Sequence, residues 1–471
     1  MKRFKERFIG DRAFYKMLIA LVLPLIVQQG VTSFVSLLDN VMVGRLGEEA
    51  ISAVAIVNQI IMVFNLAIFG GLSGASIFSA QFFGKKDMDG VKQTFRFKLV
   101  FGLLISIAAI VIFMAFGENF ISLFLHGDNS DGMLDRTMEL AKEYLGVMLI
   151  GLIPFMLVQT YTGTLRESGE TVVPMIGSTG AIIINLILNY CLIFGNLGFP
   201  ELGVKGAAIA TIIARFFEMF FIAGTAHIRS AKYPFMKGVF HGFHISGELI
   251  KKIARLGSPL LFNELFWSLG MTMISQCYST RGLDAVAAVN ITNTIWNLFS
   301  ITMIATGNGV SILVGQKLGA GDKEGARITD NRMMFVAIVS HIVMGALLCA
   351  TSGVIPMLYN VEPEVRSLST RLLICAGIAL PIHAVIHVTY FTLRTGGKTV
   401  ITFFFDCVYT WVVSVTLAYC LAHFTDMPVL GMYACIQFID IIKIIIGTIL
   451  LRSDFWLNNI VNDIDTEESA A

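Results

Sequence analysis

Charged residues are scarce in this sequence of 471 residues and make up only 14% of it, whereas about 25% is usual in soluble proteins. Hydrophobic residues make up 55% of the chain, and no soluble core could shield that much apolar surface from water. The composition therefore excludes a soluble enzyme. The alternating strands of an outer-membrane barrel are also absent. We predict an all-α polytopic membrane protein.

Cysteine is rare as well, with seven residues and no CxxC spacing. An odd total without such spacing indicates neither a disulfide framework nor a metal site, so we interpret the cysteines as small core residues. The net charge of +1 gives no sign of a nucleic-acid partner, and we expect none. The basic N-terminus leads into an apolar segment that lacks a small-residue cleavage site, which indicates a retained first span.

The apolar residues fall into twelve stretches, each long enough to cross a bilayer at about 20 residues per crossing. They lie near residues 15–42, 51–80, 97–117, 139–163, 172–195, 205–227, 251–278, 286–315, 333–357, 367–392, 399–422 and 428–451. With both termini in the cytoplasm, Lys and Arg are more than three times as frequent inside as outside. The positive-inside rule favours that orientation, and we expect a multi-pass protein of the inner (plasma) membrane.

The two halves of the chain are related by an internal repeat. An offset of 235 residues aligns Pro24 with Pro259, Asn58 with Asn293, Gln81 with Gln316 and Gly84 with Gly319. Each half has an even number of spans, so the halves insert in the same orientation, as in transporters that rock about a central cavity. We expect two pseudo-symmetric six-helix lobes, residues 1–228 and 251–452, with a cytoplasmic linker at 229–250 and an acidic C-terminal tail at 453–471.

Several acids lie inside predicted spans. An ionised side chain at mid-bilayer costs at least about 2.5 to 3.5 kcal/mol on insertion scales, so such an acid needs a partner, water or a proton. Asp39, Glu264 and Asp406 are therefore candidate cation-coupling residues. The alternatives are exposure at the outer end of a span for Asp39, a packing carboxyl held by an amide for Glu264, and a place at the cytoplasmic edge for Asp406.

Two further acids each have a base three residues away. Glu218 follows Arg215, and Asp440 precedes Lys443. Residues at this spacing are neighbours on a helix surface. We interpret both pairs as ion pairs within one helix.

Uncharged polar residues also recur inside the spans. Asn185 and Asn189 share one helix face, which indicates a polar stripe toward a cavity, although hydrogen bonds between helices also explain such residues. His383 and His387 have a spacing that suits a metal, but no carboxylate or cysteine shares their face, so we interpret them as lining a cavity or packing. The candidate substrate-binding residues are Gln28, Asn58, Asn263, Asn293, His387 and Tyr390.

Prolines lie inside four spans, at Pro24, Pro154, Pro259 and Pro381. Proline deletes a backbone hydrogen bond and kinks a helix. We predict hinges at the repeat-related pair Pro24 and Pro259, with rigid packing kinks as the alternative.

Several motifs in the chain match one family. They are Pro24 leading to Asp39-Asn40-x-Met42-x-Gly44-x-Leu46-Gly47, Gly74 to Gln81-x-x-Gly84, Leu165-Arg166-x-x-Gly169-x-Thr171-x-x-Pro174, and Gly203-x-x-Gly206-Ala207-Ala208, with their second-half copies. These motifs resemble the multidrug and toxic compound extrusion (MATE) transporters over nearly the whole chain. The resemblance implies two lobes around a cavity, alternating access, and export of organic cations in exchange for H+ or Na+.

The resemblance also implies positions for the ion site. In the DinF-type branch, an N-lobe site matches Asp39, Asn185, Asn189 and Thr211 here, with Asn189 replacing an acid of that branch. The NorM-type branch uses C-lobe acids in the seventh and tenth spans. Glu264 lies about one turn nearer the proline than in that pattern, and Asp406 lies one span later.

We therefore expect a secondary active antiporter for lipophilic organic cations, with no cofactor beyond the coupling ion, acting as a monomer in the bilayer. The nearest alternative is a flippase or exporter for a lipid-linked saccharide or metabolite of the same superfamily. Such flippases usually line their cavity with several Arg or Lys, whereas Arg215 and Lys443 are the bases inside spans. A membrane-embedded enzyme would need a clustered catalytic set that the sequence lacks, and a channel would not require two matched lobes.

Overall fold

The computed structural model describes residues 7–125, 132–359, 361–462 and 464. The described chain is helical and contains no strand. The helical segments of the first half include α2 (Arg12–Gly44), α3 (Glu48–Lys85), α4 (Met88–Ser122), α5 (Met133–Met148), the short η1 (Leu149–Gly151), α6 (Leu152–Glu167), α7 (Val172–Phe194) and α8 (Gly203–Ile228). Those of the second half include α9 (Gly247–Ser279), α10 (Leu283–Phe299), α11 (Ile301–Gly319), α12 (Lys323–Thr351), α13 (Pro363–Thr395), α14 (Thr399–Phe403), η5 (Phe404–Val408), η6 (Thr410–Val415), α15 (Thr416–Phe424), α16 (Val429–Ile439) and α17 (Ile441–Arg452). The short segments η2 (Asn196–Gly198), η3 (Pro234–Met236) and η4 (Ile355–Leu358) lie in the connections.

The helices coincide with the predicted spans. Among the described residues, ten helical segments are long and apolar enough to cross a membrane, and α10 with α11, bent by 42° at Ser300, forms an eleventh. The predicted span at 251–278 is α9, which has the length of a span at 33 residues but a more polar sequence. Two helices begin earlier than predicted, α4 by nine residues at Met88 and α12 by ten residues at Lys323, because their first turns are polar and precede the apolar run.

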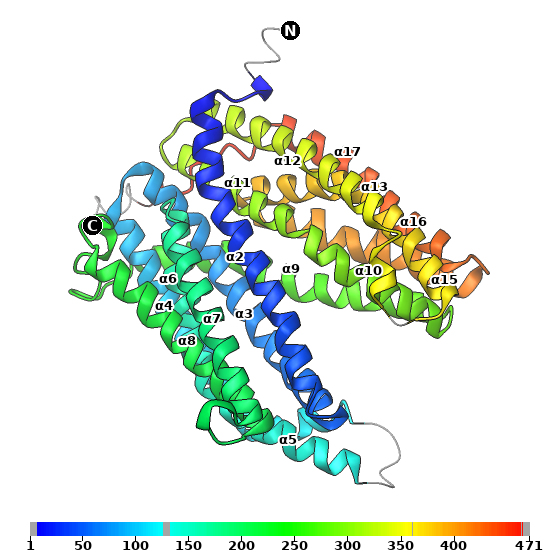
Figure 1. The fold of residues 1–471 in the computed structure, drawn as a ribbon. Coiled ribbons are helices and arrows are strands. Elements are labelled where there is room, and N and C mark those ends of the chain that lie inside the picture. Colours follow the sequence, from blue (N-terminus) through cyan, green and yellow to red (C-terminus); the bar gives the residue numbers. More distant parts are fainter. Residues whose placement is uncertain (1–6, 126–131, 360, 463, 465–471) are drawn as a thin grey trace. The chain divides into compact units, whose positions relative to one another are not determined.

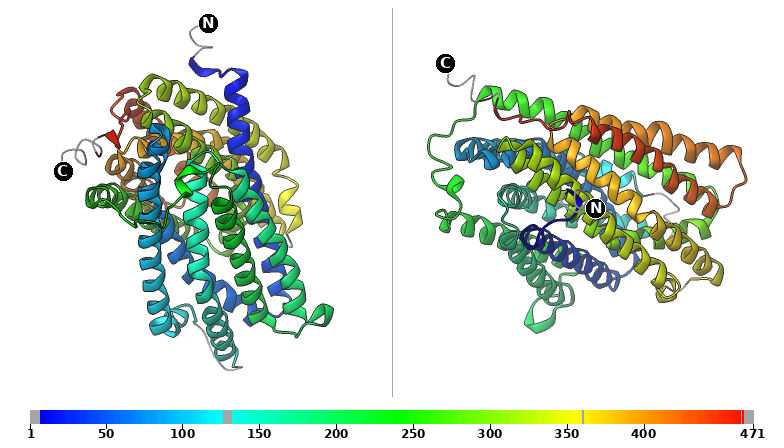
Figure 2. Two further views of the ribbon diagram at one scale, coloured as in Figure 1. Left: turned by 90° about the vertical axis from the view of Figure 1, so that its left-hand side faces the viewer. Right: turned by 90° about the horizontal axis from the view of Figure 1, so that it is seen from above.

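The chain divides into two compact units. The N-terminal unit holds Val27–Ser79 and Met88–Ile250, and the C-terminal unit holds the described residues up to Ile26, Ala80–Asp87 and those from Lys251 onward. Within the N-terminal unit α7 and α8 lie side by side (Figure 1), and its blue-to-green helices run nearly parallel in the left-hand view of Figure 2. In the C-terminal unit α12 packs along α13.

Each unit has its own apolar core. The N-terminal core includes Phe64, Ile121 and Leu145. A C-terminal core includes Leu18 and Val22 of α2 together with Val310 of α11 and Leu393 of α13. The start of α2 therefore belongs to the C-terminal unit, and the change of unit after Ile26 lies two residues beyond Pro24.

Two repeat-related glycines mark a close helix approach in the C-terminal unit. A methyl group added at Gly84 would overlap the backbone of Gln316, and one added at Gly319 would overlap the backbone of Gln81. The contact is reciprocal, because Gly84 and Gln81 are the repeat partners of Gly319 and Gln316. The residues that revealed the duplication thus meet each other at the end of α3 and the end of α11.

The chain after α17 packs against the same region. Gln81 donates to the carbonyl oxygens of Thr395 (3.1 Å) and Asn458 (3.2 Å) and accepts from the backbone N–H of Ile460 (2.9 Å). Trp456 is buried, and its indole donates to the carbonyl of Leu451 (2.9 Å). Residues 454–462 are therefore held at the ends of α3, α11 and α13.

The interpretation of the cysteines as small core residues is correct only in part. Cys191, Cys277, Cys375 and Cys407 are buried, but Cys420 and Cys435 are exposed, so those two are not core residues.

Candidate functional site

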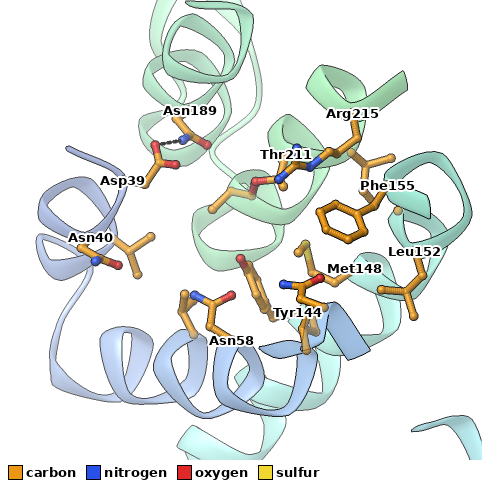
Figure 3. Close-up of a pocket in the computed structure, with 17 residues that line it drawn as sticks. Asp39, Asn40, Asn58, Tyr144, Met148, Leu152, Phe155, Asn189, Thr211 and Arg215 are labelled. Atoms are coloured by element: carbon orange, nitrogen blue, oxygen red, sulfur yellow. Dashed lines mark hydrogen bonds between the residues drawn. The ribbon is translucent and has the colours of Figure 1, made fainter. Parts of the chain in front are cut away.

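The N-terminal unit contains a cavity of about 380 Å³. Helices α2, α3, α5, α6, α7 and α8 all contribute to its walls (Figure 3). Its polar lining includes Asp39, Asn58, Tyr144, Asn189, Thr211 and Arg215. The volume lies within the range of about 300 to 1,000 Å³ that is usual for small-molecule sites.

Asp39 of α2 is held by amides of α7. The Nδ2 of Asn189 donates to Oδ1 of Asp39 at 2.7 Å. The amide of Asn185 fits best with its nitrogen toward Asp39, where it lies 3.1 and 3.2 Å from the carboxylate oxygens, and with its oxygen 3.3 Å from the hydroxyl of Thr211. The predicted i, i+4 pair on α7 therefore shares the carboxylate, and Thr211 of α8 completes the set.

The set presents more acceptors than donors. Asn189 is 2% exposed, and its Oδ1 has no hydrogen-bond partner in the described chain. No basic side chain of the described residues forms an ion pair with Asp39. Carboxylate, amide and hydroxyl oxygens are the ligands that hard cations prefer, and a buried acceptor without a donor is uncommon. The arrangement can hold a cation or a proton.

Arg215 of α8 also lines this cavity. Its Nη1 lies 2.9 Å from Oε2 of Glu218, which confirms the predicted ion pair within one helix. The guanidinium stacks over the ring of Phe155 at 5.2 Å from the centroid. The spacing of Arg215 and Glu218 along the sequence predicted their ion pair but not the place of Arg215 in the cavity.

Gln28, a predicted substrate-binding residue, lies in a polar network of the N-terminal unit. Its Nε2 donates to Ser178 Oγ (2.5 Å), and Ser178 donates to Glu218 Oε1 (2.5 Å). The carboxamide oxygen of Gln28 accepts from Nη2 of Arg166 (2.6 Å). This side chain is engaged by protein partners and does not line the cavity. Asn58 of α3, in contrast, does line it.

The C-terminal unit contains a second cluster, centred on Asp406. Asp406 lies in η5, a stretch of π-helix, a form that is rare and often found at functional sites. Its Oδ1 lies 2.7 Å from Nζ of Lys443, and its Oδ2 accepts from Asn263 at 3.0 Å. This corrects the interpretation of Lys443 as the helical partner of Asp440. The two residues lie together at the start of α17, but the ammonium of Lys443 is directed to Asp406 of η5, and the carboxylate of Asp440 lies near His383 instead.

Asp440 and the histidines have other contacts. Asp440 lies 3.8 Å from Nδ1 of His383, whose Nε2 lies 2.6 Å from Gln437 Oε1. His387 packs against the ring of Phe391, with centroids 4.9 Å apart. The two histidines thus have separate neighbours.

Glu264 joins the cluster through Tyr390. The hydroxyl of Tyr390 donates to Glu264 Oε1 at 3.2 Å and accepts from Asn263 at 3.4 Å. Asn263 is 1% exposed. Four predicted residues of the C-terminal unit, Asn263, Glu264, Tyr390 and Asp406, are therefore brought together, whereas Asn293 is exposed on α10 and belongs to no such contact.

Comparison with known proteins identifies the chain. The family model MatE matches residues 24–191 and 259–420. The chain belongs to the MATE family of transporters.

Relatives of this MATE protein include a Thermotoga maritima chain named probable multidrug resistance protein NorM, 24% identical over 416 residues that are 88% of this chain and 87% of the relative. A Bacillus subtilis chain named probable multidrug resistance protein YoeA is 25% identical over 416 residues, 88% of each chain. A solved structure, described as the outward-facing conformation of a multidrug resistance MATE family transporter of the MOP superfamily, matches with a TM-score of 0.84 at 21% identity, covering 96% and 97% of the two chains.

The predicted MATE fold is confirmed: an all-helical membrane protein with spans in two six-helix lobes. The predicted ion-site residues of the N-lobe, Asp39, Asn185, Asn189 and Thr211, do lie together. Arg215 and Lys443 were missed as site residues. Their position inside spans was a signal, since a charge in a membrane usually faces a cavity or a partner.

Proposed function

We propose that this MATE transporter is a secondary active antiporter that exports lipophilic organic cations in exchange for H+ or Na+ by alternating access. One observation carries the proposal. Asp39 is an acid inside a span, it lines a cavity, and no base of the described chain neutralises it. The names of the relatives, which are multidrug resistance proteins, support the same substrate class.

The unpaired carboxylate supplies the coupling. An ionised acid in a membrane needs a counter-charge or a proton, so Asp39 holds either the coupling ion or the cationic cargo. Because one carboxylate cannot be neutralised twice, the ion entering from outside displaces the cargo there, and cargo from the cytoplasm displaces the ion. Asn189 and Asn185 hold the carboxylate in place through both states of occupancy.

The C-terminal acids are less suited to this exchange. Asp406 already has the ammonium of Lys443 at 2.7 Å, so a second cation would have to displace an internal one. Glu264 is held by the neutral phenol of Tyr390 and is the second candidate for the coupling residue. We place both termini in the cytoplasm and expect the monomer to carry out the whole cycle in the plasma membrane, without a cofactor.

Export of ethidium by proteoliposomes tests the proposal. Gradients of protons and of sodium are imposed separately, which identifies the coupling ion. We expect Asp39→Asn to lower the gradient-driven rate by a factor of ~10 or more, since a charge-assisted interaction contributes about 1.5 to 3 kcal/mol. Asp426→Asn, which changes an exposed acid between α15 and α16, is the matched control and should keep the wild-type rate.

A double variant gives the decisive outcome. If Asp39→Asn combined with Glu264→Gln still exports ethidium at the wild-type rate under both gradients, buried acids do not couple the transport and the proposal is wrong.

A further inference from the structure

We propose that the N-terminal cavity binds ligands that carry both a positive and a negative group, and that Arg215 determines this preference by receiving the negative one. Asp39 then receives the amine. This inference rests on the proposed function, because it concerns the cargo of the same cavity, and its new content is the residue that selects ligands with a carboxylate.

The two charges face one cavity from different helices. Asp39 belongs to α2 and Arg215 to α8, and both line the cavity. In Figure 3 they lie on opposite sides, with Thr211 between them. Thr211 and Arg215 are four residues apart on α8 and so share a helix face. A ligand that spans the cavity meets a carboxylate at one end and a guanidinium at the other.

Arg215 has donors to spare. A guanidinium has five N–H groups in a planar fork that fits a carboxylate. Within the described residues only Nη1 is engaged, by Glu218 at 2.9 Å. The side chain of Arg215 is 39% exposed, whereas that of Glu218 is 5% exposed. Glu218 therefore pairs with the guanidinium on its buried side, and the remaining N–H groups are accessible from the cavity.

The neighbours of Arg215 hold it in that position. Glu218 is fixed in turn by Ser178, which donates to its second oxygen at 2.5 Å. The ring of Phe155 lies 5.2 Å beneath the guanidinium, an arrangement that favours a cation over the ring face. An arginine fixed at both its edge and its face loses little conformational freedom when a carboxylate arrives.

The charges together favour an amphoteric ligand. The Arg215–Glu218 pair is neutral as a whole, so Asp39 leaves the cavity with one unbalanced negative charge. A purely anionic ligand would leave Asp39 without a partner, and a purely cationic one would cover the free N–H groups of Arg215 without pairing them. Burying such donors without an acceptor costs free energy. A ligand with both groups satisfies both ends.

Binding to the purified full chain in detergent tests the inference. Equilibrium dialysis compares norfloxacin, which has an amine and a carboxylate, with its methyl ester, which keeps only the amine. We expect wild type to bind norfloxacin ~10-fold or more tightly than the ester, and Arg215→Gln to remove that difference by weakening norfloxacin binding ~10- to 100-fold, as expected for a charge-assisted pair. Ester binding should stay within about twofold.

Two further variants separate recognition from folding. Arg215→Gln leaves Glu218 without its partner, so the double variant Arg215→Gln with Glu218→Gln removes both charges and should show the same loss of preference. Arg136→Gln breaks an exposed ion pair of the same spacing, Arg136 with Glu139, and should change neither affinity.

The outcomes distinguish this inference from the proposed function. Equal affinities of wild type for the two ligands, or equal losses for both in the Arg215 variants, would overturn the role of Arg215. If Asp39→Asn leaves the binding of both ligands unchanged while Arg215→Gln acts as expected, the role of Arg215 stands, whereas the proposed function and the assignment of the amine to Asp39 both fail. If Asp39→Asn weakens both ligands and the Arg215 variants weaken neither, the reverse holds.

Discussion

At the scale of single residues, the predicted coupling residues Asp39 and Asp406 differ in whether a basic side chain lies beside them. Asp406 has the ammonium of Lys443 at 2.7 Å, and the Lys443 side chain is 5% exposed. Asp39 has only amides as partners. An acid without a base needs an ion or a proton from outside, so we expect Asp39 to hold the coupling ion and Asp406 to have a structural role.

Removal of the base near Asp406 should therefore destabilise the protein. Breaking a buried ion pair on one side costs about 3 to 5 kcal/mol, because the other charge stays buried alone. We expect Lys443→Met to lower the thermal midpoint of the detergent-solubilised protein by several degrees. Asp406→Asn combined with Lys443→Met should recover most of the loss, since neither charge is then unpaired. A single variant as stable as wild type would show that the pair contributes nothing.

At the scale of elements, the ends of α3 and α11 are fitted to each other by glycine. Gly84 and Gly319 each contact the backbone of the other helix, so a side chain at either position has no room. The spans themselves follow from apolar length, but this crossing does not. The sequence repeat aligned the two glycines without showing that they meet.

Gly319→Ala should weaken this crossing. The added methyl group meets backbone, which cannot move aside as a flexible side chain would, and overpacking typically costs about 1 to 3 kcal/mol. The matched control is Gly146→Ala, a glycine inside helix α5 with open space around its Cβ position, which should be neutral or slightly stabilising. Thermal unfolding of both variants in detergent measures the difference. Equal midpoints for the two would contradict the close approach.

The π-helical stretches of the eleventh span show what local pattern misses. Residues 399–422 are mostly apolar and predict an ordinary helix, yet η5 and η6 are wound more widely. No residue type in the run signals the change. Its effect is local, because the winding alters the direction in which Asp406 projects.

At the scale of the whole molecule, the distribution of Lys and Arg predicts the orientation. We expect a fluorescent protein fused after Ala471 to fold and fluoresce, and alkaline phosphatase fused there to be inactive, because the predicted orientation places the C-terminus in the cytoplasm. A phosphatase inserted at Asp426, in a predicted outer loop, should be active. The opposite pattern at both positions would reverse the orientation, since the bias in basic residues acts on the chain as a whole.

Much of the candidate site could be predicted, because burying a polar group in a membrane costs free energy. A polar group in a span is expensive, so it stands out in an apolar sequence. Asp39, Asn189 and Asn58 were found in this way, and the resemblance to a family added Thr211. Arg215 was assigned to Glu218 alone, because spacing along one helix shows only local partners.

Apolar length, the spacing of polar residues along each helix and the duplication are properties of the chain in one dimension, so they established the membrane class, the spans, the two-lobe fold and several site residues. Partners on different helices were decided only by folding. That Lys443 meets Asp406 and not Asp440, and that Arg215 and Asp39 line the same cavity, depends on how each helix is rotated about its axis and how deeply it lies against its neighbours. Many weak packing contacts set those two quantities together, and no single segment of sequence carries them.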